Sequence, residues 1–79
     1  MQKLEKITEE QEKYAIDLLT TMTVEEIAEK TKTKPSKVLH DFLASETGKL
    51  LYDASSKLWW NGPSYIAEMY ITEQKKIAP

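Results

Sequence analysis

Hydrophobic residues recur every three or four positions through most of the chain, which is the pattern of amphipathic helices. A first helix is predicted over residues 8–22, where Thr8 and Gln11 have the spacing of a capping box. A second, shorter helix is predicted over residues 23–31, with Thr23 and Glu26 as another capping box. The residues expected to face the core are Ala15, Leu18, Leu19 and Met22, and then Val24, Ile27 and Ala28.

The segment "TKTK" interrupts this periodicity, and Pro35 suits the first turn of a third helix because its missing N–H costs nothing there. That helix is expected to bury Val38, Leu39, Phe42 and Leu43. A last helix is predicted from Pro63 to residue 77, with two lysines at its negative end. Its inward residues are expected to be Ile66, Met69, Tyr70 and Ile77.

Residues 45–60 fit two structures. As a helix, they place Thr47, Leu50, Leu51 and Ala54 on one face. As a hairpin, "KLLYD" and "KLWW" would be strands joined by "ASS", but β-branched residues and an Asn-Gly or Asp-Gly turn are absent. The predicted fold is therefore a single all-α domain over residues 1–79, with four to five helices and a helix-turn-helix-like central pair. The alternative is a winged helix-turn-helix with a hairpin at residues 49–60.

Composition excludes several classes of function. The chain has 79 residues and no cysteine, so thiolate metal sites and disulfides are ruled out and a reducing cytoplasm is the expected compartment. The charged N-terminus predicts no signal peptide, and no apolar run approaches the roughly 20 residues of a membrane span. The sequence contains no nucleophile elbow and no phosphate-binding glycine loop, and His40 is its single histidine. We therefore expect no enzyme activity, no cofactor, no metal and no small-molecule substrate.

Residues 24–42 resemble a helix-turn-helix. Ile27 and Ala28 match the Ile-Ala pair of its first helix, and Val38 lies eleven positions after Ile27, where that family has an apolar residue. The segment "KPSKV" is similar to the start of a recognition helix. Lys32 replaces the glycine usual in the turn, and a lysine in the left-handed region costs about 1–2 kcal/mol. We therefore expect the turn to take another shape.

The resemblance makes a DNA-binding regulator the second functional hypothesis. Residues 30–40 contain four lysines and no acid in an otherwise acidic chain. The net charge of −2 and the absence of arginine oppose this hypothesis, because phosphate neutralisation supplies most non-specific affinity. The candidate DNA contacts are Lys30, Lys32, Lys34, Ser36, Lys37 and His40.

The C-terminal half resembles a group of short bacterial proteins with Leu-Tyr-Asp, Lys-Leu-Trp and Tyr-Ile-Ala runs, found in gene clusters that also encode ADP-ribosyltransferase-like toxins. The matching residues are Leu51, Tyr52, Asp53, Lys57, Leu58, Trp59, Pro63, Tyr65, Ile66 and Ala67. The resemblance implies a bacterial protein with an antitoxin-like or accessory role, and no mechanism comes with it.

The first functional hypothesis is a protein-interaction module that binds a protein partner or a second copy of itself. Trp59 and Trp60 are adjacent, so they point in different directions, and we expect a small core to bury only one of the two rings fully. Trp59 is predicted to be the buried one, which leaves Trp60 as a contact residue. The candidate interface residues are Tyr52, Trp59, Trp60, Tyr65 and Tyr70.

Overall fold

The computed structural model describes residues 8–77, and every regular element within this range is helical. The elements are α1 (Glu9–Thr31), α2 (Pro35–Ala44), α3 (Glu46–Leu51), the 3₁₀ turns η1 (Ala54–Ser56) and η2 (Leu58–Trp60), and α4 (Pro63–Ile77). The predicted all-α class is confirmed. The hairpin proposed at 49–60 is wrong, because this segment forms the end of α3 followed by two 3₁₀ turns.

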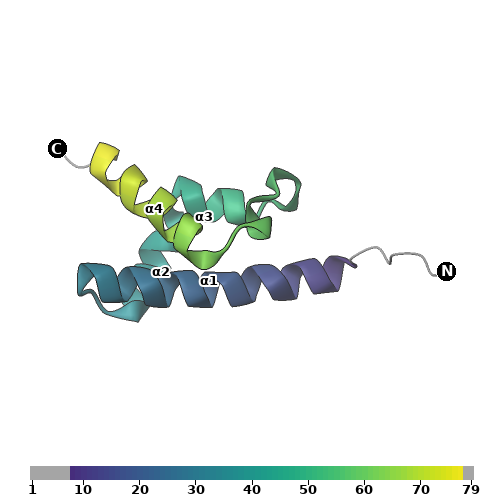
Figure 1. Cartoon of the computed structure of the whole chain (residues 1–79), viewed down its shortest axis with the longest axis horizontal. Coiled ribbons are helices and arrows are strands. Elements are labelled where there is room, and N and C mark those ends of the chain that lie inside the picture. The colour runs from purple at the N-terminus through teal and green to yellow at the C-terminus, as the bar shows by residue number, and fades with distance from the viewer. Residues whose placement is uncertain (1–7, 78–79) are drawn as a thin grey trace.

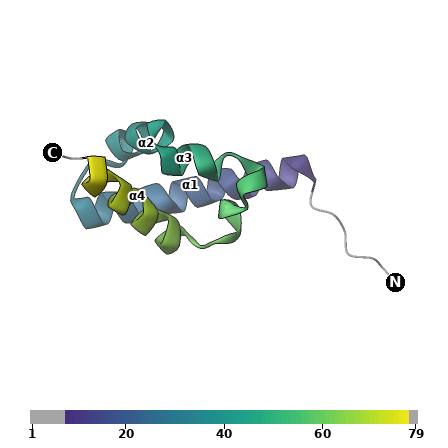
Figure 2. The ribbon, with the colours of Figure 1, turned by 90° about the horizontal axis from the view of Figure 1, so that it is seen from above.

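In Figure 1, α3 and α4 lie above α1, and α2 crosses behind α1. Seen from above, α2 and α3 lie along one flank of the α1 axis, and α4 begins on the other flank and crosses obliquely over α1 (Figure 2). The core between them contains Ile16, Val24, Ile27, Ala28, Val38, Phe42, Leu51, Leu58, Ile66, Ala67 and Tyr70. Within residues 8–77, no helix is both long and apolar enough to cross a membrane.

Helix α1 is a single helix of 23 residues, where two helices were predicted. Its Thr8–Gln11 capping box is present, but Thr23 lies inside the helix and caps nothing. The threonines between the two predicted segments do not break the helix, because the Thr20 and Thr21 hydroxyls donate to the carbonyls of Ile16 and Asp17 one turn back. Their weak helix propensity, a few tenths of a kcal/mol each, is outweighed by tertiary packing.

The inward face of α1 also differs from the predicted one. Val24, Ile27 and Ala28 are buried, as predicted. Because α1 is one continuous helix, the same buried face extends back through Thr20 to Ile16. Leu18 and Met22 then fall on the outside and are exposed. In α2, Val38 and Phe42 are buried as predicted, whereas Leu39 and Leu43 are exposed.

The turn between α1 and α2 contains a residue in the left-handed conformation, and it is a lysine at the position where the helix-turn-helix pattern has glycine. Lys32 has φ 56° and ψ 40°, so it adopts the left-handed conformation and the expected change of turn shape is wrong. Its N–H and that of Thr33 both bond to the carbonyl of Ala28, which ends the helix. Ile27, Ala28 and Val38 are all buried, as the resemblance implied.

The joint between α2 and α3 is held by Ser45, whose side chain serves both helices. Its hydroxyl donates to the carbonyl of Phe42 (2.6 Å) at the end of α2 and accepts the N–H of Gly48 (3.0 Å) in the first turn of α3. A Cβ on Gly48 would overlap the Phe42 carbonyl oxygen and lie 3.0 Å from the carbonyl carbon. Only glycine therefore allows α3 to begin so close to α2.

Candidate protein-interaction surface

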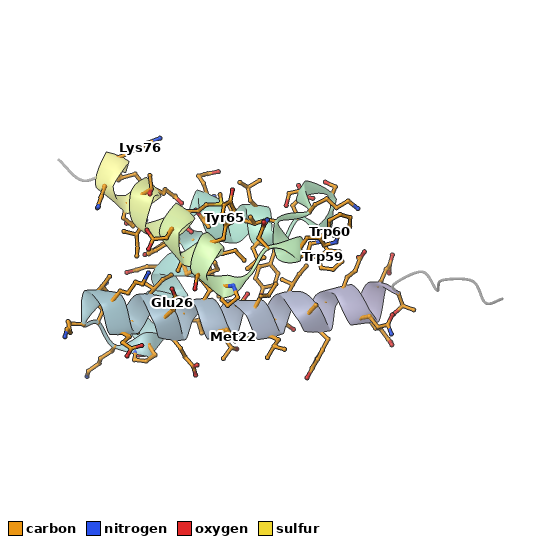
Figure 3. All side chains as sticks on the ribbon, in the orientation of Figure 1. Met22, Glu26, Trp59, Trp60, Tyr65 and Lys76 are labelled. Atoms are coloured by element: carbon orange, nitrogen blue, oxygen red, sulfur yellow. The ribbon has the colours of Figure 1, made fainter. Side chains whose placement is uncertain are left out.

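An open groove of about 590 Å³ runs between α3 and α4, and we call it the α3–α4 groove. Its apolar lining comes from Leu50 of α3 and from Tyr65, Met69 and Ile77 of α4. Its polar rim consists of Glu46, Thr47, Glu68, Thr72, Glu73 and Lys76. Tyr65 and Lys76, both labelled in Figure 3, lie towards the two ends of the α4 side of this groove.

Three of the four apolar side chains that line this groove are exposed. Tyr65 is 56% exposed and Ile77 is 66% exposed. Leu50 is also exposed, and Met69 is partly buried against the core. The inward placement predicted for Leu50 and Ile77 is therefore wrong, and that of Met69 holds in part. Apolar side chains gathered around one depression, with polar residues at the rim, are typical of a contact surface.

The carboxylate of Glu73 fixes α4 to α3 and so shapes the groove. Its two oxygens accept the N–H of Glu46 (2.8 Å) and the N–H and hydroxyl of Thr47 (3.0 and 2.7 Å). Burial by itself would raise the pKa of Glu73, but the hydrogen bonds from Thr47 and Glu46 outweigh it and hold the pKa below its ordinary value. A side chain of α4 thus satisfies the free N–H groups at the start of α3.

Two of the predicted interface residues are held by internal contacts. Tyr70 is buried, with its ring 5.6 Å from that of Phe42, so it belongs to the core and its assignment to a contact surface is wrong. The Tyr52 ring is exposed, but its hydroxyl donates to Asp17 (2.9 Å) and lies 3.0 Å from the Thr20 hydroxyl. Tyr52 therefore ties the end of α3 to α1.

The two tryptophans differ as predicted. Trp59 is partly buried against the core, and its indole N–H donates to the carbonyl of Ala54 (3.1 Å). Trp60 is 67% exposed and packs edge-on against Trp59 at 5.9 Å, with Lys57 Nζ 4.9 Å from its ring. Figure 3 shows both rings at η2, towards the N-terminal end of α1. Of the five predicted interface residues, Trp60 and Tyr65 are the ones with largely free rings.

The lysine-rich segment is not free of acids in three dimensions. Lys30 Nζ lies 2.7 Å from Glu68 of α4 and 3.3 Å from Glu26. Lys37 Nζ lies 2.9 Å from Asp41. The carboxylates hold the pKa of both lysines above the ordinary value, mainly through the hydrogen bonds that Lys30 donates to Glu68 and Lys37 donates to Asp41. Half of the four lysine charges are thus already paired with acids of the same chain.

The remaining candidate DNA contacts lie on the surface around the start of α2. Lys32, Lys34, Ser36 and His40 are exposed, and His40 Nδ1 is 3.5 Å from Asp41. Three acids, Glu26, Asp41 and Glu68, therefore lie beside the candidate DNA contacts. Residues 8–77 contain no group of three or more metal-ligating side chains.

Comparisons of the chain with protein-family models, curated proteins and solved structures gave no significant match.

Proposed function

We propose that this chain is a small bacterial protein-interaction module, the regulatory or antitoxin-like member of a gene pair, and that it has no enzymatic activity. The α3–α4 groove is the observation that carries the proposal. It presents Leu50, Tyr65 and Ile77 to solvent around a concave surface that Glu73 holds in shape. A hydrophobic groove of this kind can receive the apolar face of a partner helix.

A direct test is co-expression with the protein encoded by the adjacent gene, followed by measurement of the affinity of the purified pair. Tyr65→Ala combined with Ile77→Ala should weaken binding by at least about tenfold, because exposed apolar anchors dominate small interfaces. The melting temperature should hardly change, since both side chains are more than half exposed.

Leu43→Ala is the matched control, because Leu43 is a large apolar residue on α2 that is 45% exposed and lies outside the groove. It should leave the affinity for the adjacent gene product unchanged. A complex that tolerates the groove double variant but is lost in Trp60→Ala would move the contact surface to η2. An adjacent gene product that does not bind at all would count against the gene-pair role.

DNA binding is the second candidate, favoured by the exposed positions of Lys32, Lys34 and Ser36 at the start of α2 in a helix-turn-helix-like pair. The ion pairs of Lys30 and Lys37 weaken it, because each must be broken or bypassed before the lysine neutralises a phosphate. We expect little binding to duplex DNA at physiological salt. Sub-micromolar affinity that is lost in Lys34→Glu with Lys37→Glu would reverse the ranking.

A further inference from the structure

The side of α1 that faces away from the other helices carries a row of large apolar side chains. Tyr14, Leu18 and Met22 are spaced four residues apart, so they lie one above another on the helix surface. Tyr14 is 70% exposed and Leu18 is 47% exposed. Figure 3 shows Met22 projecting away from the other helices. Packing within the described residues therefore does not explain this row.

Two glutamates continue the row towards the C-terminal end of α1. Glu25 and Glu29 are exposed and form no ion pair with any residue in the range 8–77. Glu26, on the flank towards α4, is instead paired with Lys30 and accepts a hydrogen bond from Ser64. We define the outer face of α1 as Tyr14, Leu18, Met22, Glu25 and Glu29.

The charge of α1 indicates which partner could cover this face. Residues 9–31 contain seven carboxylates and two lysines. In an antiparallel pair of two copies about Leu18, the Glu25 and Glu29 region of each would lie against the glutamate-rich first turn of the other. In a parallel pair, Glu25 and Glu29 would face themselves. Like charges brought together at an interface cost binding energy, so the face is not suited to a second copy.

We propose that the outer face of α1 binds a basic amphipathic helix of another protein. Apolar residues of that helix pack along Tyr14, Leu18 and Met22, and its lysines or arginines pair with Glu25 and Glu29. This inference does not depend on the α3–α4 groove, because none of the five residues lines that groove. The module would then have two separate protein-binding surfaces.

The probe is a fluorescein-labelled amphipathic helix of leucine and lysine, about 18 residues or five turns long. Fluorescence anisotropy should show binding to the full chain, and the same peptide with glutamate in place of lysine should not bind. Leu18→Gln with Met22→Gln should weaken binding at least about tenfold. Glu25→Gln with Glu29→Gln should weaken it and flatten its dependence on salt, because the paired charges are lost.

The groove double variant, Tyr65→Ala with Ile77→Ala, is the matched control and should bind the lysine peptide like the parent chain. If it loses as much affinity as the outer-face variants, the peptide sits in the groove and the inference is wrong. Unchanged affinity and salt dependence in the Glu25 and Glu29 variant would also overturn it. Sedimentation gives an independent check, since a dimer that Leu18→Gln dissociates would mean that a second copy covers the face.

Discussion

The two junctions on either side of α2 are built in different ways. At the first, Lys32 adopts a left-handed conformation, and Lys34 begins α2 without a side-chain hydrogen bond to the helix. At the second, the Ser45 side chain bonds to both helices, Gly48 leaves no Cβ between them, and Glu73 holds the first N–H groups of α3. The first junction thus lacks a side-chain cap and has an unfavourable backbone conformation at Lys32. In the second, the N–H groups at the start of α3 are hydrogen-bonded.

The difference shows where each junction gets its stability. Packing holds the first one, because Ile27 and Ala28 of α1 and Val38 of α2 are all buried in one core cluster. That packing outweighs an unfavourable backbone conformation at the turn. Directional hydrogen bonds and close backbone approach hold the second, where small changes cannot be absorbed. Substitutions that improve capping or turn geometry should therefore stabilise the first junction. A substitution that raises helix propensity, such as glycine to alanine, should destabilise the second.

The largest effect is expected for Gly48→Ala. The new methyl group would overlap the Phe42 carbonyl oxygen, which is backbone and cannot rotate away, so α3 must shift from α2. We expect a loss of about 3 kcal/mol or more in the free energy of unfolding, measured by urea denaturation. Gly62→Ala is the control, because a Cβ there meets no atom within 4 Å, and its stability should stay within about 0.5 kcal/mol. Equal effects would mean that the close approach of α2 and α3 is not formed.

The second effect is expected for Glu73→Gln, which replaces a carboxylate that accepts three hydrogen bonds from α3. We expect a loss of about 1–2 kcal/mol at neutral pH. Because the folded pKa lies below the unfolded one, the stabilisation is present above the ordinary pKa of about 4.3 and is lost as the pH falls through the folded pKa. The parent chain should therefore lose stability in acid more steeply than the variant.

Thermal melts from pH 7 to pH 3 measure this difference. Glu46→Gln is the control, since the Glu46 side chain is exposed at the rim of the same groove and only its backbone N–H bonds to Glu73. It should follow the parent curve. Parallel curves for the parent and Glu73→Gln would show that the carboxylate does not cap α3 in solution.

The elements that sequence predicted well are those with strong local signals. Thr8 with Gln11 marked the start of α1, and Pro35 and Pro63 marked the starts of α2 and α4. The inward faces were harder, because hydrophobicity favoured Leu18 and Met22 over Thr20 and Thr23. Threonine hydroxyls bond to the helix carbonyls one turn back, as at Thr20, so a threonine can occupy a core position. Thr23 is also buried, and its hydroxyl has no hydrogen-bond partner among the described residues.

The candidate surface was predicted only in part, for a similar reason. Aromatic content pointed to Trp60 and Tyr65, which are exposed, but also to Tyr70, which fills the core beside Phe42. Leu50 and Ile77 were expected inside, because each continues an apolar stripe of its helix. Both are exposed, since periodicity alone does not show which residues of a stripe the core reaches. The pairing of Lys30 with Glu68 joins residues 38 positions apart, so the acid-free run of lysines gave no sign of it.

The third effect is a gain, expected for Lys34→Asp at the uncapped start of α2. Lys34 has the extended backbone of an N-cap residue, so an aspartate there can accept the N–H of the second or third helical residue and also favours the positive end of the helix. We expect a gain of about 1 kcal/mol in the free energy of unfolding. Lys34→Ala separates the loss of the lysine from the new cap and should leave stability nearly unchanged. A gain in both variants would point to relief of charge repulsion among the lysines.

The smallest effect is expected for Lys32→Gly, which removes the side chain from the left-handed position at the end of α1. Relief of the backbone cost is partly offset, because glycine also gains freedom in the unfolded chain, so the net gain should be about 0.5–1 kcal/mol. Lys32→Ala is the matched control: it removes the same charge but keeps a Cβ at φ 56°, so it should gain nothing. Urea denaturation of the three chains measures the difference directly. A loss of stability in Lys32→Gly alone would mean that residue 32 has a negative φ in solution, and the helix-turn-helix-like junction would then have a different turn.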